Sequence, residues 1–223
     1  KFGNFESFRS FAALKVMTNR EQILRITASL FLERGCKSLT MDEVASANGM
    51  SKRTLYELFH DKAELLQECI LLQHKDNMLR SEDELSRAGN VLEWFMHSLR
   101  SKDSQRMTFY YDFFTEVKKY YPEVFLNVVR DVNRWHCEML ERIIEQGQKE
   151  GLFITGVLDA HTLSLQLFEL SVAVTDRAVR NYLEIKHDRS SDCLMLFLIR
   201  GIASEKGRAY IDEYLENNKS MLK

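Results

Sequence analysis

Hydrophobic residues three and four positions apart recur along most of this chain, which is the spacing of helices that bury one face. The first clear run covers residues 19–34, and its shared face carries Ile23, Ile26, Leu30 and Phe31. Gly35 follows at the place where a helix often ends in a left-handed residue. The pattern therefore predicts a helix over 19–34 that ends at Gly35.

A second helix start lies at Thr40, because Thr40 and Glu43 have the spacing of a capping box. Val44 and Ala45 face inward on the short helix that follows. The tripeptide Asn48-Gly49-Met50 then interrupts the helical pattern. We expect a helix of about two turns followed by a tight turn.

A third helix is predicted from Lys52 to His60, with Ser51 as its N-cap. Leu55 and Phe59 are four residues apart and Leu58 lies beside them, so these three form its buried face. The residues expected on the opposite face are Arg53, Tyr56, Glu57 and His60. Two short helices joined by a glycine turn predict a helix-turn-helix, whose second helix has a size suited to the DNA major groove.

The rest of the chain predicts longer helices. One begins after Asp61. The others are expected at residues 91–99, 104–121, 122 to about 150, 159 to about 185 and 192 to about 216. Pro122 ends one of these helices and suits the first turn of the next. We therefore predict an all-α fold of about nine helices, with a three-helix DNA-binding domain over residues 17–64 and a C-terminal helical bundle over residues 65–223.

The composition supports this fold and narrows the function. The chain has one proline and nine glycines among 223 residues, and runs of alternating β-branched residues are few. Its formal net charge is −2, which argues against a protein that coats nucleic acid with its whole surface, so any DNA contact must be local. The longest apolar run covers residues 193–199, too short for a membrane span of about 20 residues. We expect a cytoplasmic protein.

The four cysteines, Cys36, Cys69, Cys137 and Cys193, are scattered along the chain. Their spacing favours buried reduced thiols in an intracellular protein over a disulfide framework or a zinc site. No metal and no cofactor are predicted.

The first sixteen residues carry Phe2, Phe5, Phe8 and Phe11 at every third position, and Met17 follows them. One interpretation is that Met17 is the natural start and that residues 1–16 are a non-native or flexible extension. The alternative is a short amphipathic helix that packs on a partner. We favour the extension.

The segment from Thr40 to Leu66 resembles the signature of the TetR family of bacterial transcription regulators. The family pattern is T-x-x-x-[IV]-A-x-x-x-G-[VM]-S-x-x-T-[LI]-Y-x-x-F-x-x-K-x-x-L. The matching residues are Thr40, Val44, Ala45, Gly49, Met50, Ser51, Thr54, Leu55, Tyr56, Phe59, Lys62 and Leu65. Twelve matches in one register are far more specific than an isolated glycine motif. The motif covers about a fifth of the chain, and the helical layout beyond it fits the family less specifically.

The predicted DNA-binding residues follow from this motif. Ser51, Lys52, Arg53 and Thr54 lie at the start of the recognition helix, where base edges and phosphates are met. The resemblance implies phosphate contacts for Tyr56 and Lys62, and Thr40 is a candidate for another. Each has a simpler alternative: Thr40 and Ser51 as helix caps, Tyr56 as a packing residue and Arg53 as a solvated charge.

The sequence departs from the family pattern in and around the recognition helix. Arg53 stands where many members carry glycine or alanine. The two-pronged guanidinium group of Arg53, its fork, can donate two hydrogen bonds to guanine. Glu57 and Leu58 stand where aromatic residues or histidine are common. Glu57 would repel phosphate but can accept from cytosine N4, whereas Leu58 cannot donate to a phosphate. Residues 17–62 carry seven Lys or Arg against six Asp or Glu, so non-specific DNA affinity should be weak.

The resemblance also implies a homodimer and a small-molecule effector. The eighth predicted helix carries Leu163, Leu167, Leu170 and Val174, and the ninth is apolar on nearly every side. Burial within one subunit is one explanation, and the resemblance favours a four-helix bundle between two subunits that bind a near-palindromic operator. The effector is expected to be apolar or aromatic. Its candidate residues are Trp94, His97, Phe109, Tyr110, Phe113, Glu116, Trp135 and Met139, for which plain core packing is the alternative.

The favoured function is a dimeric repressor that its effector releases from the operator. One competing hypothesis is a helical interaction protein of the same fold that no longer binds DNA. Another is an enzyme, which the sequence disfavours because it has no Ser/His/Asp arrangement, phosphate-binding glycine loop or metal-ligand spacing.

Overall fold

The computed structural model describes residues 19–100, 113–156, 159–175 and 190–218. Within these ranges the only β-structure is an isolated bridge between Phe153 and Ala203. Residues 113–120 are helical. The other helices are α1 (Asn19–Arg34), α2 (Met41–Ala47), α3 (Lys52–Leu58), α4 (Lys62–Arg87), α5 (Val91–Arg100), α7 (Pro122–Lys149), α8 (Ala160–Thr175), α10 (Ser190–Ile202) and α11 (Glu205–Asn217). The predicted all-α fold is confirmed.

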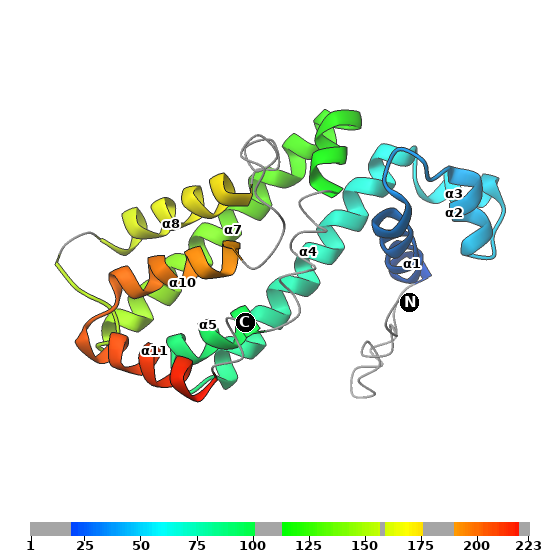
Figure 1. The fold of residues 1–223 in the computed structure, drawn as a ribbon. Helices are drawn as coiled ribbons and strands as arrows, with labels where there is room; N and C mark the ends of the chain where they lie inside the picture. Colours follow the sequence, from blue (N-terminus) through cyan, green and yellow to red (C-terminus); the bar gives the residue numbers. More distant parts are fainter. Residues whose placement is uncertain (1–18, 101–112, 157–158, 176–189, 219–223) are drawn as a thin grey trace.

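The helices form a small unit and a larger bundle joined by one long helix (Figure 1). Helices α1, α2 and α3 lie together at one end of the molecule. From there α4 extends to the opposite end, beside α5 and α11. The predicted domain boundary at residues 64 and 65 falls inside this continuous helix and stays a prediction.

The core of the small unit extends past the helix-turn-helix. Ile23 and Phe31 of α1 are buried together with Leu55 and Phe59, which confirms the predicted buried face of the third helix. The same cluster takes in residues from the start of α4, from segment 113–120 and from α7: Leu65, Leu66, Cys69, Ile70, Phe113, Val117, Val124 and Val128. Segment 113–120 is therefore packed against the small unit.

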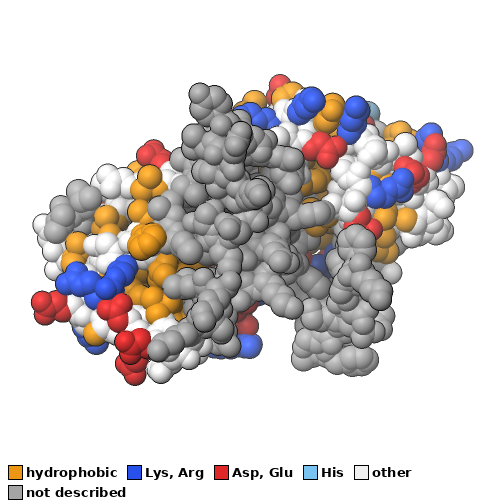
Figure 2. All heavy atoms as spheres, in the orientation of Figure 1, with side chains coloured by type: hydrophobic (Ala, Val, Ile, Leu, Met, Phe, Trp, Pro, Cys, Tyr) orange, Lys and Arg blue, Asp and Glu red, His pale blue; other side chains and the backbone are white. Residues whose placement is uncertain are grey.

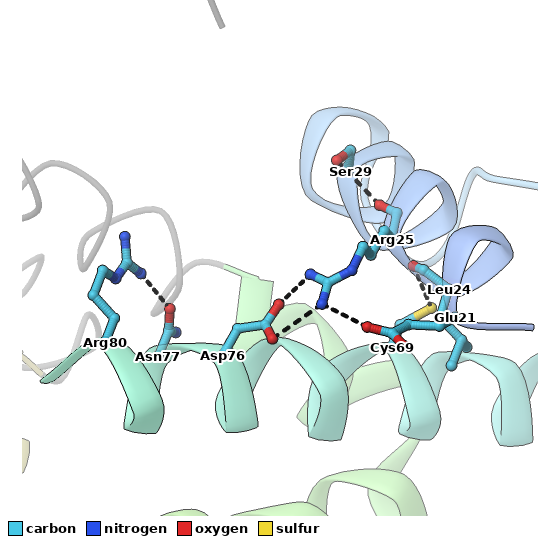
Figure 3. A network of polar contacts seen from close by, with 8 residues as sticks. All are labelled: Glu21, Leu24, Arg25, Ser29, Cys69, Asp76, Asn77 and Arg80. Carbon is cyan, nitrogen blue, oxygen red and sulfur yellow. Dashed lines mark hydrogen bonds and ion pairs between the residues drawn. The ribbon is translucent and has the colours of Figure 1, made fainter. Parts of the chain in front are cut away.

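Ion pairs attach α1 to the middle of α4 (Figure 3). The guanidinium of Arg25 is paired with Asp76 through both of its terminal nitrogens, and Nη2 also donates to Glu21 at 2.8 Å. The thiol of Cys69 donates to the carbonyl oxygen of Leu24 at 3.4 Å. The ion pairs of Arg25 are partly buried and the Cys69 bond is fully buried, so α1 and α4 are held together both near the surface and in the core.

A second hydrophobic core forms the bundle from α5, α7, α8, α10 and α11. Its most deeply buried side chains include Leu92, Met96, Ile144, Ile199 and Ile211. No helix within the described residues combines the length and apolarity needed to cross a bilayer.

The predicted ninth helix, 192 to about 216, is wrong: two helices, α10 and α11, stand in its place. The helix is interrupted at Ala203 and Ser204 because backbone groups there form hydrogen bonds with the segment after α7. Ile154 N donates to the carbonyl oxygen of Ile202 at 2.9 Å, and Ser204 N donates to that of Leu152 at 2.9 Å. The hydroxyl of Ser204 then caps α11 by accepting from Gly207 N at 3.1 Å.

Other boundaries differ by little. The third helix ends at Leu58 instead of His60, since Phe59 has an extended backbone with φ −135°. Helix α8 is described to Thr175, and the remainder of the predicted eighth helix lies outside the described residues. The same holds for residues 1–16 and for the first part of the predicted helix 104–121.

Candidate DNA interface

The helix-turn-helix is built from α2, a short turn and α3. Gly49 in the turn has φ +65°, a backbone conformation that glycine adopts without strain. Met50 N donates to the carbonyl oxygen of Ala45 at 3.0 Å, and the side chain of Asn48 donates to that of Val44 at 2.8 Å. These bonds satisfy the last carbonyl groups of α2 and fix where α3 begins.

Thr40 and Glu43 form the predicted capping box. The Thr40 hydroxyl accepts from Glu43 N at 3.3 Å, and the Glu43 carboxylate accepts from Thr40 N at 2.8 Å. These bonds from Thr40, helped by the guanidinium of Arg34, lower the pKa of Glu43 to about 2. The box keeps the start of α2 ordered, and the side chain of Thr40 is committed to it.

The start of the recognition helix presents four exposed side chains: Ser51, Lys52, Arg53 and Thr54. Ser51 caps α3 by accepting from Thr54 N at 3.1 Å, and the two hydroxyl groups lie 2.8 Å apart. The predicted base-reading residues thus share one solvent-facing surface, and the serine also has the capping role that was its alternative.

The two cations of this surface are paired with carboxylates. Lys52 Nζ lies 3.0 Å from Asp42, and Arg53 Nε donates to Glu57 at 3.0 Å. Because Glu57 engages only Nε, the two terminal nitrogens of Arg53 have no partner among the described residues. Glu57 therefore orients the fork of Arg53 while it lowers the net charge of the helix.

The two candidate phosphate contacts differ in exposure. Tyr56 is 44% exposed on α3. Lys62 is half-buried, donates to the carbonyl oxygen of Lys37 at 3.3 Å and lies 5.7 Å from the ring centroid of Tyr121. Burial lowers the pKa of Lys62. Tyr56 is thus open to a ligand, whereas Lys62 faces segment 113–121.

The predicted effector residues are divided between the two cores. Trp94, Trp135 and Met139 belong to the bundle core, and His97 is exposed. Phe113 is buried in the core of the small unit, and Glu116 accepts a hydrogen bond from Lys37 N at 2.8 Å. Phe109 and Tyr110 lie outside the described residues. The structure therefore gathers only Trp94, Trp135 and Met139 in one cluster.

Two histidines that are dispersed in the sequence, and were not predicted as site residues, join this cluster. His74 on α4 and His136 on α7 lie 5.4 and 5.0 Å from the ring of Trp135, and His136 stacks on Phe168 of α8 at 6.1 Å. Burial lowers the pKa of both histidines. Helical spacing alone could not reveal that their helices meet.

Three buried polar groups have no hydrogen-bond partner among the described residues: the indole nitrogens of Trp94 and Trp135 and the hydroxyl of Tyr214. Buried polar groups are nearly always satisfied in proteins, so these three groups call for an explanation. In the described part of the chain, no three or more His, Cys, Asp and Glu residues are grouped to hold a metal ion.

Comparison with known proteins identifies the N-terminal region. Residues 23–69 match the model of the bacterial regulatory proteins of the tetR family. The chain is 25% identical over 145 residues to the HTH-type transcriptional repressor KstR2 of Mycobacterium tuberculosis, covering 62% of this chain and 71% of that protein. It is 33% identical over 107 residues to the HTH-type transcriptional activator FasR of Mycolicibacterium smegmatis, covering 44% and 48%.

The fold extends the similarity beyond the helix-turn-helix. A transcriptional regulator from Cytophaga hutchinsonii superposes with a TM-score of 0.68 at 21% identity, over 82% of this chain and 98% of that one. The family and these relatives are regulators of transcription and not enzymes. Residues 23–69 thus carry the helix-turn-helix region of the tetR family of bacterial regulatory proteins, and the chain as a whole shares its fold with a transcriptional regulator.

Proposed function

We propose that the protein is a dimeric repressor that binds a near-palindromic operator through α3 and is released by a small molecule. The observation that carries the DNA-binding role is the start of α3, where Ser51, Lys52, Arg53 and Thr54 are exposed together. The free fork of Arg53, oriented by Glu57, suits the O6 and N7 acceptors of guanine. Tyr56 is the exposed candidate for a contact to the sugar–phosphate backbone of DNA. Lys62 and Thr40 would join it by exchanging their hydrogen bonds to Lys37 and Glu43 for bonds to phosphate.

The proposed dimer uses the outer face of α8 and α10. Leu163 and Leu167 of α8 are buried in their own subunit, whereas Leu165, Leu170 and Phe197 are 40%, 44% and 68% exposed. Hydrophobic side chains are visible on this side of the molecule in Figure 2. Large exposed apolar residues on two adjacent helices favour a subunit interface, and pairing these helices with a second copy gives a four-helix bundle.

The proposed effector binds in the bundle beside Trp94, Trp135 and Met139. The unpartnered indole nitrogens of both tryptophans favour an apolar or aromatic molecule that carries an acceptor oxygen. The neutral rings of His74 and His136 lie beside Trp135 and add surface suited to an aromatic ligand. Binding there would favour one spacing of the two DNA-binding units over another.

Repression is the favoured direction because a dimer that covers a promoter excludes polymerase. One relative is a repressor and another is an activator, so the direction of regulation must be measured in a gene-expression assay. A reporter driven by the selected operator should be silenced by the protein and restored by the effector. Activation of that reporter would reverse the sign of the proposal and leave the DNA-binding role intact.

Operators selected from genomic fragments would test the dimer and its half-site spacing. Two recognition helices about 34–36 Å apart meet successive major grooves, so inserting five base pairs between half-sites should abolish binding. Phe197→Glu should yield monomers with weak operator binding, whereas Leu126→Glu, at an apolar residue that is 54% exposed on α7, should remain dimeric. Binding that ignores the insertion, or a dimer that survives Phe197→Glu, would contradict the proposed arrangement.

Effector binding can be followed through the fluorescence of the chain's two tryptophans. A molecule that releases the operator should also change this fluorescence, and Trp135→Phe should weaken its binding. If no selected DNA binds better than random DNA, the function becomes that of a helical interaction protein of the same fold.

A further inference from the structure

Three lysines gather outside the helix-turn-helix, where segment 113–120 meets the turn between α1 and α2. Lys37 lies in that turn, and Lys118 and Lys119 lie near the end of the helical segment. The ammonium groups of Lys37 and Lys119 both lie 5.1 Å from the ring centroid of Tyr120. Lys118 is the sequence neighbour of Lys119, and its ammonium lies 5.7 Å from the ring centroid of Phe125. We call these three residues the lysine patch. Figure 2 shows Lys and Arg side chains along this edge of the molecule.

The patch differs from the rest of the DNA-binding unit in its charge balance. Around the helix-turn-helix the cations are matched by carboxylates, in the pairs Arg20–Glu68, Arg25–Asp76, Arg34–Glu43, Lys52–Asp42 and Arg53–Glu57. Across the described residues, Lys37, Lys118 and Lys119 form no ion pair, and all three are exposed. Their positive charge is therefore available to an outside partner.

The acidic groups near the patch do not cancel it. The carboxylate of Glu116 is turned toward the backbone N–H of Lys37, and Glu123 stands exposed in the first turn of α7. The ammonium of Lys119, followed by that of Lys37, lowers the pKa of the Tyr120 hydroxyl, as expected in a locally positive field.

The patch is continuous with the proposed DNA surface. Lys62, a candidate phosphate contact at the start of α4, donates to the carbonyl oxygen of Lys37 at 3.3 Å. The patch thus adjoins the proposed DNA surface at Lys62. A DNA duplex presents one negative charge per about 1.7 Å of its length, so a duplex that passes the patch offers several phosphates to these lysines.

We propose that Lys37, Lys118 and Lys119 bind the sugar–phosphate backbone of DNA that flanks each operator half-site. Lysine is a mobile point charge that suits phosphates without reading sequence. The patch supplies the non-specific affinity that the charge-matched helix-turn-helix lacks. An acidic protein is the other partner that such a surface fits, and the continuity with Lys62 favours DNA. The inference rests on the proposed DNA-binding function.

The test uses the full chain, the double variant Lys118→Gln/Lys119→Gln and two duplexes. One duplex contains only the two half-sites, and the other carries ten further base pairs on each side. The wild-type protein should bind the longer duplex more tightly. In the variant this advantage should vanish. The plot of the logarithm of the binding constant against log salt should become shallower, by about 0.9 in the magnitude of its negative slope for each phosphate that the protein no longer neutralises. Adding Lys37→Gln should lower the slope further.

Lys75→Gln is the matched control, because Lys75 is an exposed lysine of α4 outside the patch. It should change neither the slope nor the preference for the longer duplex. If the wild-type protein binds the operator but the double variant keeps the wild-type salt slope and preference for the longer duplex, the proposed role of the lysine patch is overturned and an acidic protein partner is favoured. The proposed DNA-binding function would still stand. A wild-type protein that binds no selected DNA would overturn the proposed function and the patch together.

Discussion

The carboxylate of Glu116 accepts a hydrogen bond from the backbone N–H of Lys37 across 2.8 Å, which joins segment 113–120 to the turn after α1. The turn is formed by Gly35, which has φ +80°, and a Cβ placed there would lie 2.5 Å from Glu116 Oε2. The DNA-binding unit and the segment that precedes α7 are thus closely fitted at this point.

Gly35→Ala should therefore destabilise the protein more than Gly49→Ala does. Both glycines have positive φ, which costs an L-residue about 1–2 kcal/mol, but the space around Gly49 is open. We expect the free energy of unfolding to fall by about 1 kcal/mol for Gly49→Ala and by about 2–3 kcal/mol for Gly35→Ala, measured by urea unfolding. Adding Glu116→Ala to the Gly35 variant should recover part of the excess. Equal losses at the two glycines would show that the fit at Glu116 is unimportant.

Ser51 offers a way to separate helix capping from DNA contact. Ser51→Ala removes the cap of α3 and should lower the free energy of unfolding by about 1 kcal/mol. Ser51→Asp keeps a good cap but adds a negative charge at the proposed phosphate surface. It should match the wild-type protein in thermal unfolding yet bind the operator weakly. Wild-type affinity in the aspartate variant would remove Ser51 from the interface.

The half-buried pair of His74 and His136 should make the protein less stable in acid. Burial, followed by the charge of His136, lowers the pKa of His74 from 6.5 to about 4, while Asp131 acts in the opposite direction. The unfolded chain therefore binds more protons than the folded one between these values, and the free energy of unfolding should fall as the pH falls from 6.5 toward 4. Urea unfolding across this range should show a shallower fall in His74→Gln and an unchanged fall in His97→Gln, at an exposed histidine. A His74 variant with the wild-type pH profile would contradict this account.

The thiols of the small unit should resist alkylation in the folded protein. Burial, together with the charge of Glu116, raises the pKa of Cys36 to about 12, and burial raises the pKa of Cys69 as well. Because the thiolate is the reactive form, iodoacetamide at pH 8 should label half-buried Cys137 before either of them. Peptide mass spectrometry gives the order, and urea should make all three react at similar rates. Early labelling of Cys36 would show that the turn after α1 opens readily.

The local signals of the DNA-binding unit were strong enough to be interpreted from sequence. Thr40 and Glu43 form their capping box, Ser51 caps α3, and Leu55 and Phe59 are buried as the spacing predicted. Each depends on neighbours within four residues, where side-chain spacing and backbone geometry are directly linked.

Contacts between residues far apart in the sequence could not be predicted from the spacing of hydrophobic and polar residues. The break at Ser204 depends on hydrogen bonds from a segment about fifty residues earlier, although Ser204 followed by Glu205 was an available sign of a helix start. Glu116 was expected beside an effector, but its hydrogen bond with Lys37 depends on how segment 113–120 packs on α1. The meeting of His74, Trp135 and His136 likewise follows from the packing of α4 on α7.

Sequence-specific DNA binding through the start of α3 underlies the proposed function. The most direct test is the ratio of affinities for a selected operator and for random duplex DNA, in the wild-type protein and in Arg53→Ala. We expect the wild-type protein to prefer the operator by at least about 10³-fold. The variant should lose about 1–3 kcal/mol on the operator and little on random DNA. A wild-type ratio near one, or a variant that keeps the full preference, would contradict the claim.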